Sequence, residues 1–219
     1  MSRRLFVLRP EPGAGATVAR AKILGIAAEA VPLFEVIALP WAMPDEAFDA
    51  LLLTSANAVR VGGAGLAALR ALPVHAVGEA TAEAARAAGF TVASVSDGGV
   101  GAVRLPVGAR VLHLCGEDHV AVPSAVALPV YAARALPAAE ALRGIDGQVA
   151  AVHSARAGAR VRGLVETRGV PIATIALVAI SARAAAALGE GWEQVAVAAR
   201  PTDAAVVELA ARLCHTMRR

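Results

Sequence analysis

The feature that most constrains this 219-residue chain is a short unit that recurs along it. Each unit is a short apolar run, then a cluster of small polar residues, then an alanine-rich stretch with helical spacing. The apolar runs begin at Leu5, Leu51, Val74, Val149 and Ile175. We expect helices from about Ala16 to Leu24, from Asn57 towards Leu69, and from Thr81 to a cap at Gly89. This alternation predicts parallel sheets flanked by helices, the α/β class.

The second half of the sequence repeats part of the first. When Ser55 is aligned with Ser154, the segment VHAVGEATAEAARAAGF falls near ALVAISARAAAALGEGW. This duplication predicts two similar lobes. Phe34 to Leu39 and Leu128 to Ala135 are strand-like, are bounded by prolines, and are interpreted as paired crossovers. The predicted domains are residues 1–34 with 137–219 and residues 41–127, joined by linker strands 35–40 and 128–136.

Composition narrows the class of protein. Apolar residues make up 57% of the chain and charged residues 18%, which excludes disorder. The longest nearly uncharged stretch, Val170 to Ala182, is too short to cross a bilayer. The apolar run Leu5 to Leu8 is too short for a signal peptide, so we expect a cytoplasmic protein. Cys115 and Cys214 lack metal-site or redox spacing and are interpreted as reduced packing residues.

The charge distribution argues for a small anionic partner. The net charge is +3, and Lys22 is the only lysine, so the positive charge is almost all arginine. The arginines are scattered singly and not interleaved with aromatic residues, unlike the basic face of a nucleic-acid binder. A small polyanionic substrate therefore fits the sequence better than DNA or RNA.

Small polar residues follow several predicted strands. These residues are Ser55, Asn57, Thr81, Ser154 and Ser181. Ligands of open parallel sheets bind outside the carboxyl ends of the strands, and the unpaired N–H groups of helix starts favour anions. Helix capping alone is the simpler interpretation of any one of them. Their expected position at one shared edge favours anion binding.

Arginines and one tyrosine extend this set. Arg9, Arg134, Arg156, Arg183 and Arg200 lie next to predicted strand ends or crossovers, where a guanidinium could bind a carboxylate, although solvated surface positions explain them equally well. Tyr131, the only tyrosine, lies on the second crossover. Its phenol could donate a proton, and packing alone is the alternative.

Metal and nucleotide sites have little support. The histidines His75, His113, His119, His153 and His215 lack a ligand spacing such as HExxH. The glycine-rich segments 13–15 and 98–101 match neither common nucleotide-binding pattern and are interpreted as turns. The sequence therefore predicts no metal and no cofactor.

Several segments together resemble uroporphyrinogen-III synthases in order and spacing. They are LRP at 8–10, LLTSANAV at 52–59, VGEATAEAARAAG at 77–89, VY at 130–131, HSARAG at 153–158, ISARAAAAL at 180–188, and GW followed by VAVAARPTDAAVVEL. The resemblance covers nearly the whole chain. It implies two α/β lobes, joined by a two-stranded ladder, with hydroxymethylbilane bound in the cleft between them.

The resemblance also implies a reaction. Members of this family remove the hydroxyl of hydroxymethylbilane, form a spiro intermediate through ring D, and close the ring with ring D inverted, giving uroporphyrinogen III for haem, sirohaem, cobalamin and chlorophyll. By matching positions, Tyr131 would assist departure of the hydroxyl. The expected substrate-binding residues are Arg9, Ser55, Asn57, Gly78, Thr81, Ser154, Arg156, Ser181 and Arg183. We expect a monomer without metal or cofactor, and the family's chemistry allows a transient hand-over from hydroxymethylbilane synthase.

One departure from the family pattern leaves alternatives open. Between Gly116 and Val130 the family usually has a full helix, whereas here Pro123 and Pro129 predict a shortened segment. A non-catalytic two-lobed module that binds a tetrapyrrole or another anion is therefore a second hypothesis. A nucleotide-dependent α/β enzyme is a third.

Overall fold

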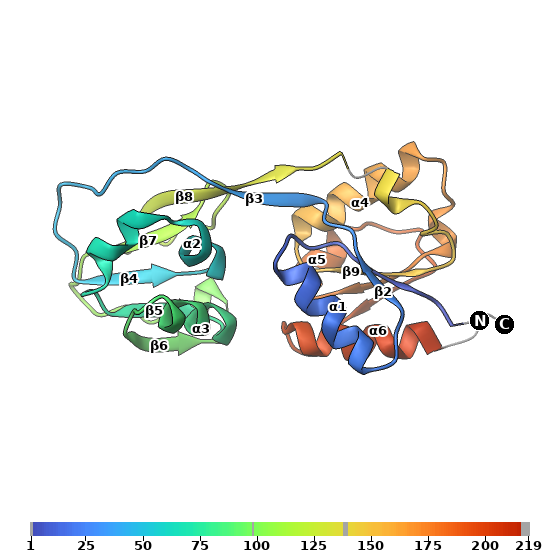
Figure 1. Cartoon of the computed structure of the whole chain (residues 1–219), viewed down its shortest axis with the longest axis horizontal. Coiled ribbons are helices and arrows are strands. Elements are labelled where there is room, and N and C mark those ends of the chain that lie inside the picture. The colour runs from blue at the N-terminus through green and yellow to red at the C-terminus, as the bar shows by residue number, and fades with distance from the viewer. Residues whose placement is uncertain (1, 98, 138–139, 216–219) are drawn as a thin grey trace. The chain divides into compact units, whose positions relative to one another are not determined.

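The computed structural model describes residues 2–97, 99–137 and 140–215. The chain folds into two compact units, shown in Figure 1: the terminal unit, Met1–Glu35 with Ala135–Arg219, and the central unit, Val36–Arg134. Each unit has its own sheet, which confirms the predicted class of two α/β lobes. Gly98 of the glycine-rich segment, and residues 1, 138–139 and 216–219 of the predicted terminal domain, lie outside the described residues.

The terminal unit has a five-stranded sheet in the order β11-β10-β9-β1-β2. Its strands are β1 (Leu5–Val7), β2 (Ala28–Ala30), β9 (Val149–Val152), β10 (Ala176–Ala179) and β11 (Gln194–Val197). Its helices are α1 (Gly13–Ile23), α4 (Ala155–Thr167), α5 (Ala182–Ala186) and α6 (Asp203–His215), with 3-10 turns η3 (Glu140–Leu142) and η4 (Ile172–Thr174). Every strand pairs with its neighbours in parallel, as the alternating pattern predicts.

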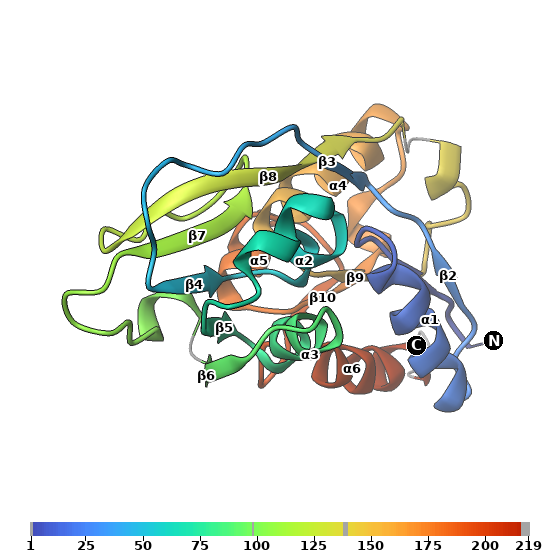
Figure 2. The ribbon, with the colours of Figure 1, turned by 60° about the vertical axis from the view of Figure 1, so that its left-hand side comes forward.

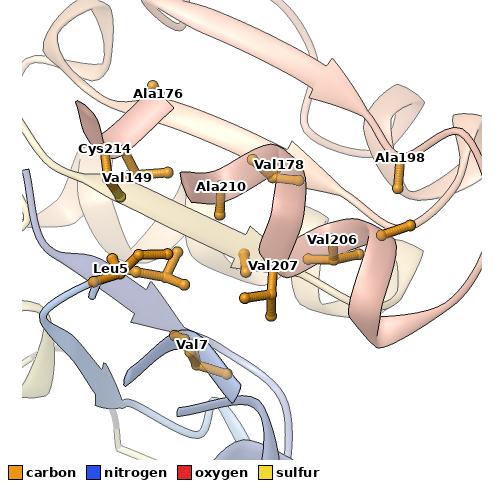
Figure 3. Close-up of a cluster of buried hydrophobic side chains, with 14 of the residues drawn as sticks. Leu5, Val7, Val149, Ala176, Val178, Ala198, Val206, Val207, Ala210 and Cys214 are labelled. Atoms are coloured by element: carbon orange, nitrogen blue, oxygen red, sulfur yellow. The ribbon is translucent and has the colours of Figure 1, made fainter. Parts of the chain in front are cut away.

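Helices cover both faces of the terminal sheet. Helices α1 and α6 lie side by side on one face (Figures 1 and 2). Figure 3 shows Leu5 and Val7 of β1 in the same cluster as Val207 of α6. On the other face, α4 and α5 contact β9 and β10. All residues of β9 and β10 are buried, which explains why these strands are continuous apolar runs in the sequence.

The central unit has a six-stranded sheet in the order β3-β8-β7-β4-β5-β6. Its strands are β3 (Phe34–Ala38), β4 (Ala50–Leu53), β5 (Val74–Val77), β6 (Val92–Ser96), β7 (Val111–Gly116) and β8 (Ala125–Ala135). Its helices are α2 (Ala56–Val61) and α3 (Glu79–Ala87), with 3-10 turns η1 (Ala64–Leu69) and η2 (Val100–Ala102). From β8 to β6 the neighbouring strands are parallel.

Strands β3 and β8 carry the chain from one unit to the other. The Leu39 N–H donates to the Val130 carbonyl at 3.0 Å, and the Leu136 N–H donates to the Leu33 carbonyl at 3.0 Å. As residue numbers rise on one strand they fall on its partner, so the two strands run antiparallel. This pair is the two-stranded ladder that the sequence resemblance implies.

The two units repeat the same strand order. Aligning β4 with β9, as the match of Ser55 with Ser154 requires, pairs β5 with β10, β6 with β11, β7 with β1 and β8 with β2. The central order β8-β7-β4-β5-β6 then becomes β2-β1-β9-β10-β11, which is the terminal sheet. The duplication therefore extends to the sheet topology, with a different starting strand in each unit.

The central unit departs from this repeat in its helices. Helix α2 ends at Val61, and Gly63, with a φ of 75°, precedes the 3-10 turn η1, so the expectation of one helix towards Leu69 was wrong. Residues 117–124 form no helix, which confirms the predicted shortening. The face opposite α2 and α3 is covered instead by side chains such as Val103, Leu105 and Val122. No helix among the described residues is long and apolar enough to cross a membrane.

Candidate functional site

Each sheet has one point where the strand order reverses. In the terminal unit β1 lies between β2, the next strand in the chain, and β9, so the reversal falls between β1 and β9. In the central unit it falls between β4 and β7 by the same reasoning. Ligands of open α/β sheets bind outside the carboxyl ends of the strands at such points. Ligand-binding residues are therefore expected along these two edges.

Three serines occupy the predicted positions after a strand and cap the following helix. The Oγ of Ser55 accepts the Asn57 N–H at 3.2 Å, that of Ser154 accepts the Ala157 N–H at 3.1 Å, and that of Ser181 accepts the Ala184 N–H at 3.3 Å. They start α2, α4 and α5. The capping interpretation is confirmed for all three, and it leaves other N–H groups of each first turn without a helical partner.

Thr81 does not cap a helix as expected. Gly78, with a φ of 78°, occupies the N-cap of α3, and the helix begins at Glu79. Glycine adopts this left-handed conformation without steric cost, so the chain turns three residues earlier than the sequence pattern suggests. Thr81 lies inside the first turn and is 5% exposed. The capping expectation for Thr81 was wrong.

Tyr131 is brought to the reversal point of the central sheet by a bulge. Cys115 pairs with Pro129, but Gly116 pairs with Tyr131, so β8 has one extra residue. A bulge redirects side chains, and here Val130 and Tyr131 both pack on the core beneath α2 and α3. Burial raises the pKa of the Tyr131 phenol, whereas the nearby Ser55 side chain lowers it. The effect of burial is the larger, so the pKa lies above its ordinary value. The phenol is therefore protonated at neutral pH and lies beside the start of α2.

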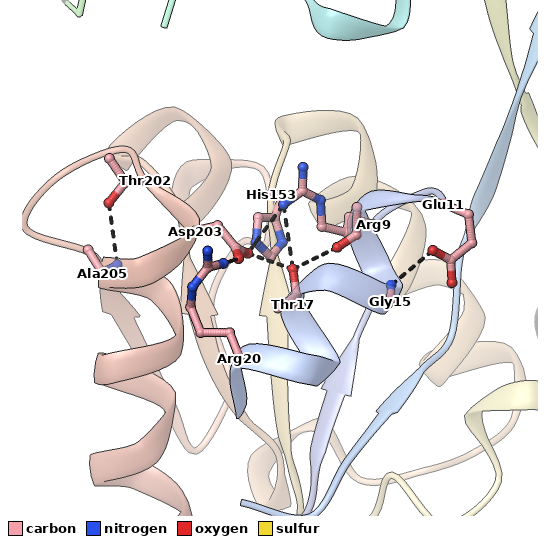
Figure 4. Close-up of polar contacts among 10 residues, drawn as sticks. Arg9, Glu11, Gly15, Thr17, Arg20, His153, Thr202, Asp203 and Ala205 are labelled. Atoms are coloured by element: carbon pink, nitrogen blue, oxygen red, sulfur yellow. Dashed lines mark hydrogen bonds and ion pairs between the residues drawn. The ribbon is translucent and has the colours of Figure 1, made fainter. Parts of the chain in front are cut away.

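Arg9 takes part in a cluster at the reversal point of the terminal sheet (Figure 4). The carboxylate of Asp203, the first residue of α6, accepts hydrogen bonds from Thr17 Oγ1 at 2.6 Å and His153 Nε2 at 2.9 Å. Arg9 Nη1 lies 3.2 Å from the same oxygen, Oδ1, and Arg20 binds the other oxygen, Oδ2. These residues are called the Asp203 cluster below.

The protonation states of the Asp203 cluster follow from its contacts. Burial alone would raise the pKa of Asp203, but hydrogen bonds from His153 and Thr17, together with the charge of Arg9, lower it to about 2. Burial lowers the pKa of His153 by more than its bond to Asp203 raises it. At neutral pH the cluster thus contains one carboxylate, a neutral imidazole and the guanidiniums of Arg9 and Arg20.

The other candidate arginines lie outside both groups. The Arg156 guanidinium lies 4.7 Å from the centroid of the Phe34 ring, a cation–π contact at the start of β3. Arg134 pairs with Glu117. Arg183 and Arg200 are exposed, on α5 and before α6. The structure thus brings together Tyr131 with Ser55, and places Arg9 in the Asp203 cluster.

The histidines of the central unit make local contacts. His113 Nε2 lies 2.9 Å from Thr54 Oγ1, and His75 Nδ1 lies 2.7 Å from Ser94 Oγ. Burial and the nearby His119 lower the pKa of His113 to about 4. Among the described residues, no group of three or more His, Cys, Asp or Glu side chains could hold a metal ion.

Sequence reasoning missed five residues that the structure places at these two edges: Thr17, Gly116, His153, Arg20 and Asp203. For Asp203 a signal was present, because it follows β11 as Ser154 follows β9. Thr202, which caps α6 by accepting the Ala205 N–H at 3.3 Å, carries the same signal. For Thr17 and Arg20, inside a helix, no local pattern marks a contact with a residue more than 180 positions away.

Comparison with known proteins gives a consistent result. The family model of uroporphyrinogen-III synthase HemD matches residues 15–208. The solved uroporphyrinogen-III synthetase of Helicobacter pylori 26695 is 20% identical, with 96% of this chain and 99% of that chain covered and a TM-score of 0.68. A mutant uroporphyrinogen III synthase of Thermus thermophilus is 20% identical, with 96% and 98% covered and a TM-score of 0.53. These two structures support the fold. No curated protein matches at a significant level.

Proposed function

Because the chain belongs to the uroporphyrinogen-III synthase family, we propose that Tyr131 assists departure of the substrate hydroxyl and that the carboxyl-end edges of the sheets bind substrate carboxylates. The chain is a cyclising hydro-lyase of tetrapyrrole biosynthesis. It converts hydroxymethylbilane to uroporphyrinogen III, with loss of water and inversion of ring D.

The reaction needs one proton at the leaving group and control of a reactive cation. When the C–O bond breaks, the hydroxyl leaves as water if a nearby acid supplies a proton. Tyr131 can supply it, because its phenol stays protonated at neutral pH. Ring closure later releases a proton from the attacked pyrrole carbon, and this proton can restore the phenol. The remaining task is orientation of the cation and exclusion of competing closure.

The position of Tyr131 carries this proposal: it is paired with Gly116 at the end of β7, and its buried phenol is near enough to Ser55 for that side chain to lower its pKa. The phenol thus lies near Ser55, the N-cap of α2, at the reversal point of the central sheet. The Asn57 N–H donates to the Ser55 hydroxyl, so the serine is itself fixed. A buried phenol beside this fixed serine is suited to proton transfer to a leaving group, which requires a positioned acid.

Binding of the substrate is proposed to use the helix starts of both units. Ser154 begins α4, a helix of 13 residues, whose dipole and N–H groups favour a carboxylate. Gly78 supports the same role at α3, since a residue without a side chain lets a ligand approach the backbone closely. Arg9 is the charged partner we propose in the terminal unit.

The Tyr131→Phe variant tests the catalytic role. Porphobilinogen and its deaminase would supply hydroxymethylbilane, and the ratio of isomer III to isomer I would be measured after oxidation. We expect the variant to lower the rate of isomer III formation at least about 100-fold, as is usual for loss of a general acid. Wild-type activity in a folded Tyr131→Phe protein would exclude this role. A wild-type protein that leaves the isomer ratio unchanged would favour the non-catalytic binding module.

Further expectations belong to this proposal. We propose the sequence-based domain limits, 1–34 with 137–219 and 41–127, a monomer, a cytoplasmic location, and transient hand-over from hydroxymethylbilane synthase. Two buried free thiols support a reducing compartment, since burial raises the pKa of both Cys115 and Cys214 to about 11. The exposed large apolar side chains lie on several elements, with only Ile23 and Leu24 adjacent in the chain, and this spread supports a monomer. Sedimentation analysis would test the monomer.

A further inference from the structure

The Asp203 cluster joins four separate segments of the terminal unit through one carboxylate. Arg9 follows β1, Thr17 and Arg20 lie on α1, His153 follows β9, and Asp203 starts α6. Every one of the four other side chains contacts an oxygen of Asp203. The carboxylate oxygen Oδ1 alone receives three of these contacts, at 2.6 to 3.2 Å.

The place of the cluster in the sheet favours ligand binding. Arg9 follows β1 and His153 follows β9, and these neighbouring strands form the reversal point of the terminal sheet. Ligands of open α/β sheets bind there.

The charges of the cluster do not balance. Two guanidiniums face one carboxylate, and His153 is neutral at pH 7 because burial lowers its pKa. The side chain of Asp203 is 18% exposed, whereas those of Arg9 and Arg20 are 30% and 46% exposed. The negative charge is thus covered, and the excess positive charge is open to solvent. A carboxylate ligand can neutralise it.

The geometry leaves part of Arg9 available to a ligand. Its Nη1 contacts Asp203 and lies 3.5 Å from Thr17 Oγ1. Figure 4 shows the other terminal nitrogen of Arg9 pointing away from Asp203, with no contact drawn to it. Because the guanidinium is planar, fixing one nitrogen also fixes the direction of the other donors. Asp203 therefore orients a guanidinium that still has donors for a carboxylate.

We propose that Arg9 and Arg20 form a carboxylate-binding subsite, and that Asp203 is the positioning residue that holds both guanidiniums in place. The subsite rests on the proposed function, because it needs a substrate with carboxylate side chains. The subsite adds Arg20 and Asp203 to the substrate-binding residues expected from the sequence. Asp203 lowers the net positive charge of the subsite, which by itself disfavours an anionic ligand. It therefore promotes binding only by orienting the two arginines.

The Asp203→Asn variant separates orientation from charge. Loss of the carboxylate raises the net positive charge, so charge alone would tighten binding of an anionic substrate and lower KM. Loss of orientation has the opposite effect. We expect KM for hydroxymethylbilane to rise about tenfold with kcat changed less than about twofold, the pattern of lost binding common to ground and transition states. An unchanged or lower KM would overturn the proposal.

Glu140→Gln is the matched control. Glu140 also binds two arginines of the terminal unit, Arg143 and Arg168. It lies in η3, which precedes β9, whereas the Asp203 cluster lies at the end where β9 finishes. Its substitution makes the same change of charge and should leave KM within about twofold, because no ligand is expected at that edge. A KM increase equal to that of Asp203→Asn would show a general charge effect and contradict the subsite.

Two further measurements keep the test decisive. If Asp203→Asn does not fold, Arg20→Gln can be measured in its place. This variant removes one exposed guanidinium and should raise KM about threefold or more. An unchanged KM in Arg20→Gln would reject the subsite. If the wild-type protein forms no excess of isomer III, the proposed function fails. The subsite is then tested by fluorescence titration with uroporphyrin III, whose carboxylates should bind wild type more tightly than Arg20→Gln, and equal affinities would reject it.

Discussion

The Tyr131 ring lies directly over Gly116, so that a Cβ added to the glycine would come within 2.8 Å of ring carbons Cε2 and Cζ. The two residues are paired across β7 and β8 because β8 has one extra residue after Pro129. The Glu117 N–H, which follows the glycine, donates to the Tyr131 carbonyl at 2.8 Å. The position of the phenol therefore depends on the absence of a side chain at residue 116.

Gly116→Ala should displace the phenol without removing it. The added methyl group overlaps the ring, and the side chain of Tyr131 can move more easily than the paired strands. We expect the rate of isomer III formation to fall about tenfold, with a stability loss of about 1 to 3 kcal/mol. Initial rates and urea unfolding of the purified variant would measure both.

A double-mutant cycle shows whether this loss passes through Tyr131. If Gly116→Ala acts only by moving the phenol, it should have little further effect on activity in a Tyr131→Phe background. Additive losses would mean that the glycine matters for another reason, such as the path of β7.

Ser55→Ala should affect catalysis, whereas Ser154→Ala should affect mainly stability. Both serines cap a helix, so each substitution should cost about 1 kcal/mol of unfolding free energy. Only Ser55 also lies near Tyr131, where it lowers the pKa of the phenol. We expect kcat to fall at least about fivefold in Ser55→Ala and less than about twofold in Ser154→Ala, where the backbone N–H groups remain. Equal kcat values in the two variants would argue against a role of the Ser55 hydroxyl beside Tyr131.

Arg156→Met should lower stability more than substrate affinity. The Arg156 guanidinium stacks on Phe34, which is 6% exposed at the start of β3. Loss of this contact should cost about 1 kcal/mol, while KM for hydroxymethylbilane stays within about twofold. Denaturant unfolding and steady-state kinetics would measure these values. Arg183→Met, at an exposed position of α5, is the matched control for stability. A large KM effect in Arg156→Met alone would instead support the predicted role of Arg156 as a substrate contact.

The fold was predictable because its signals are local. Continuous apolar runs such as those of β9 and β10 appear in the sequence because both faces of these strands are buried. The alignment of Ser55 with Ser154 pairs strands that also correspond in the two sheet orders. Errors arose where glycine conformation decided the outcome. Gly63 ended the predicted helix before Leu69, and Gly78 took the cap expected at Thr81.

The site was only partly predictable because its contacts are distant in sequence. Strand ends located Ser55, Ser154 and Arg9, since polar residues after apolar runs are visible in the sequence. The bulge that pairs Gly116 with Tyr131 depends on how two strands fit together. The contacts of Asp203 with Thr17 and Arg20 join segments far apart in the chain. The sequence alone does not show which of its many polar and charged residues a single aspartate will contact in the folded protein.

The stability of the protein should fall as the pH drops from 7 to 4.5, and His113 should account for much of the loss. His113 is 1% exposed, and burial with the nearby His119 lowers its pKa to about 4 from an ordinary value of 6.5. The unfolded chain therefore binds a proton between these values while the folded chain does not, so the free energy of unfolding decreases with falling pH. One such group contributes about 2 to 3 kcal/mol over this range. Urea unfolding at pH 7, 5.5 and 4.5 should show a smaller decrease for His113→Gln than for His215→Gln, since His215 is exposed on the last turn of α6. Equal decreases in the two variants would show that His113 is not the group that titrates.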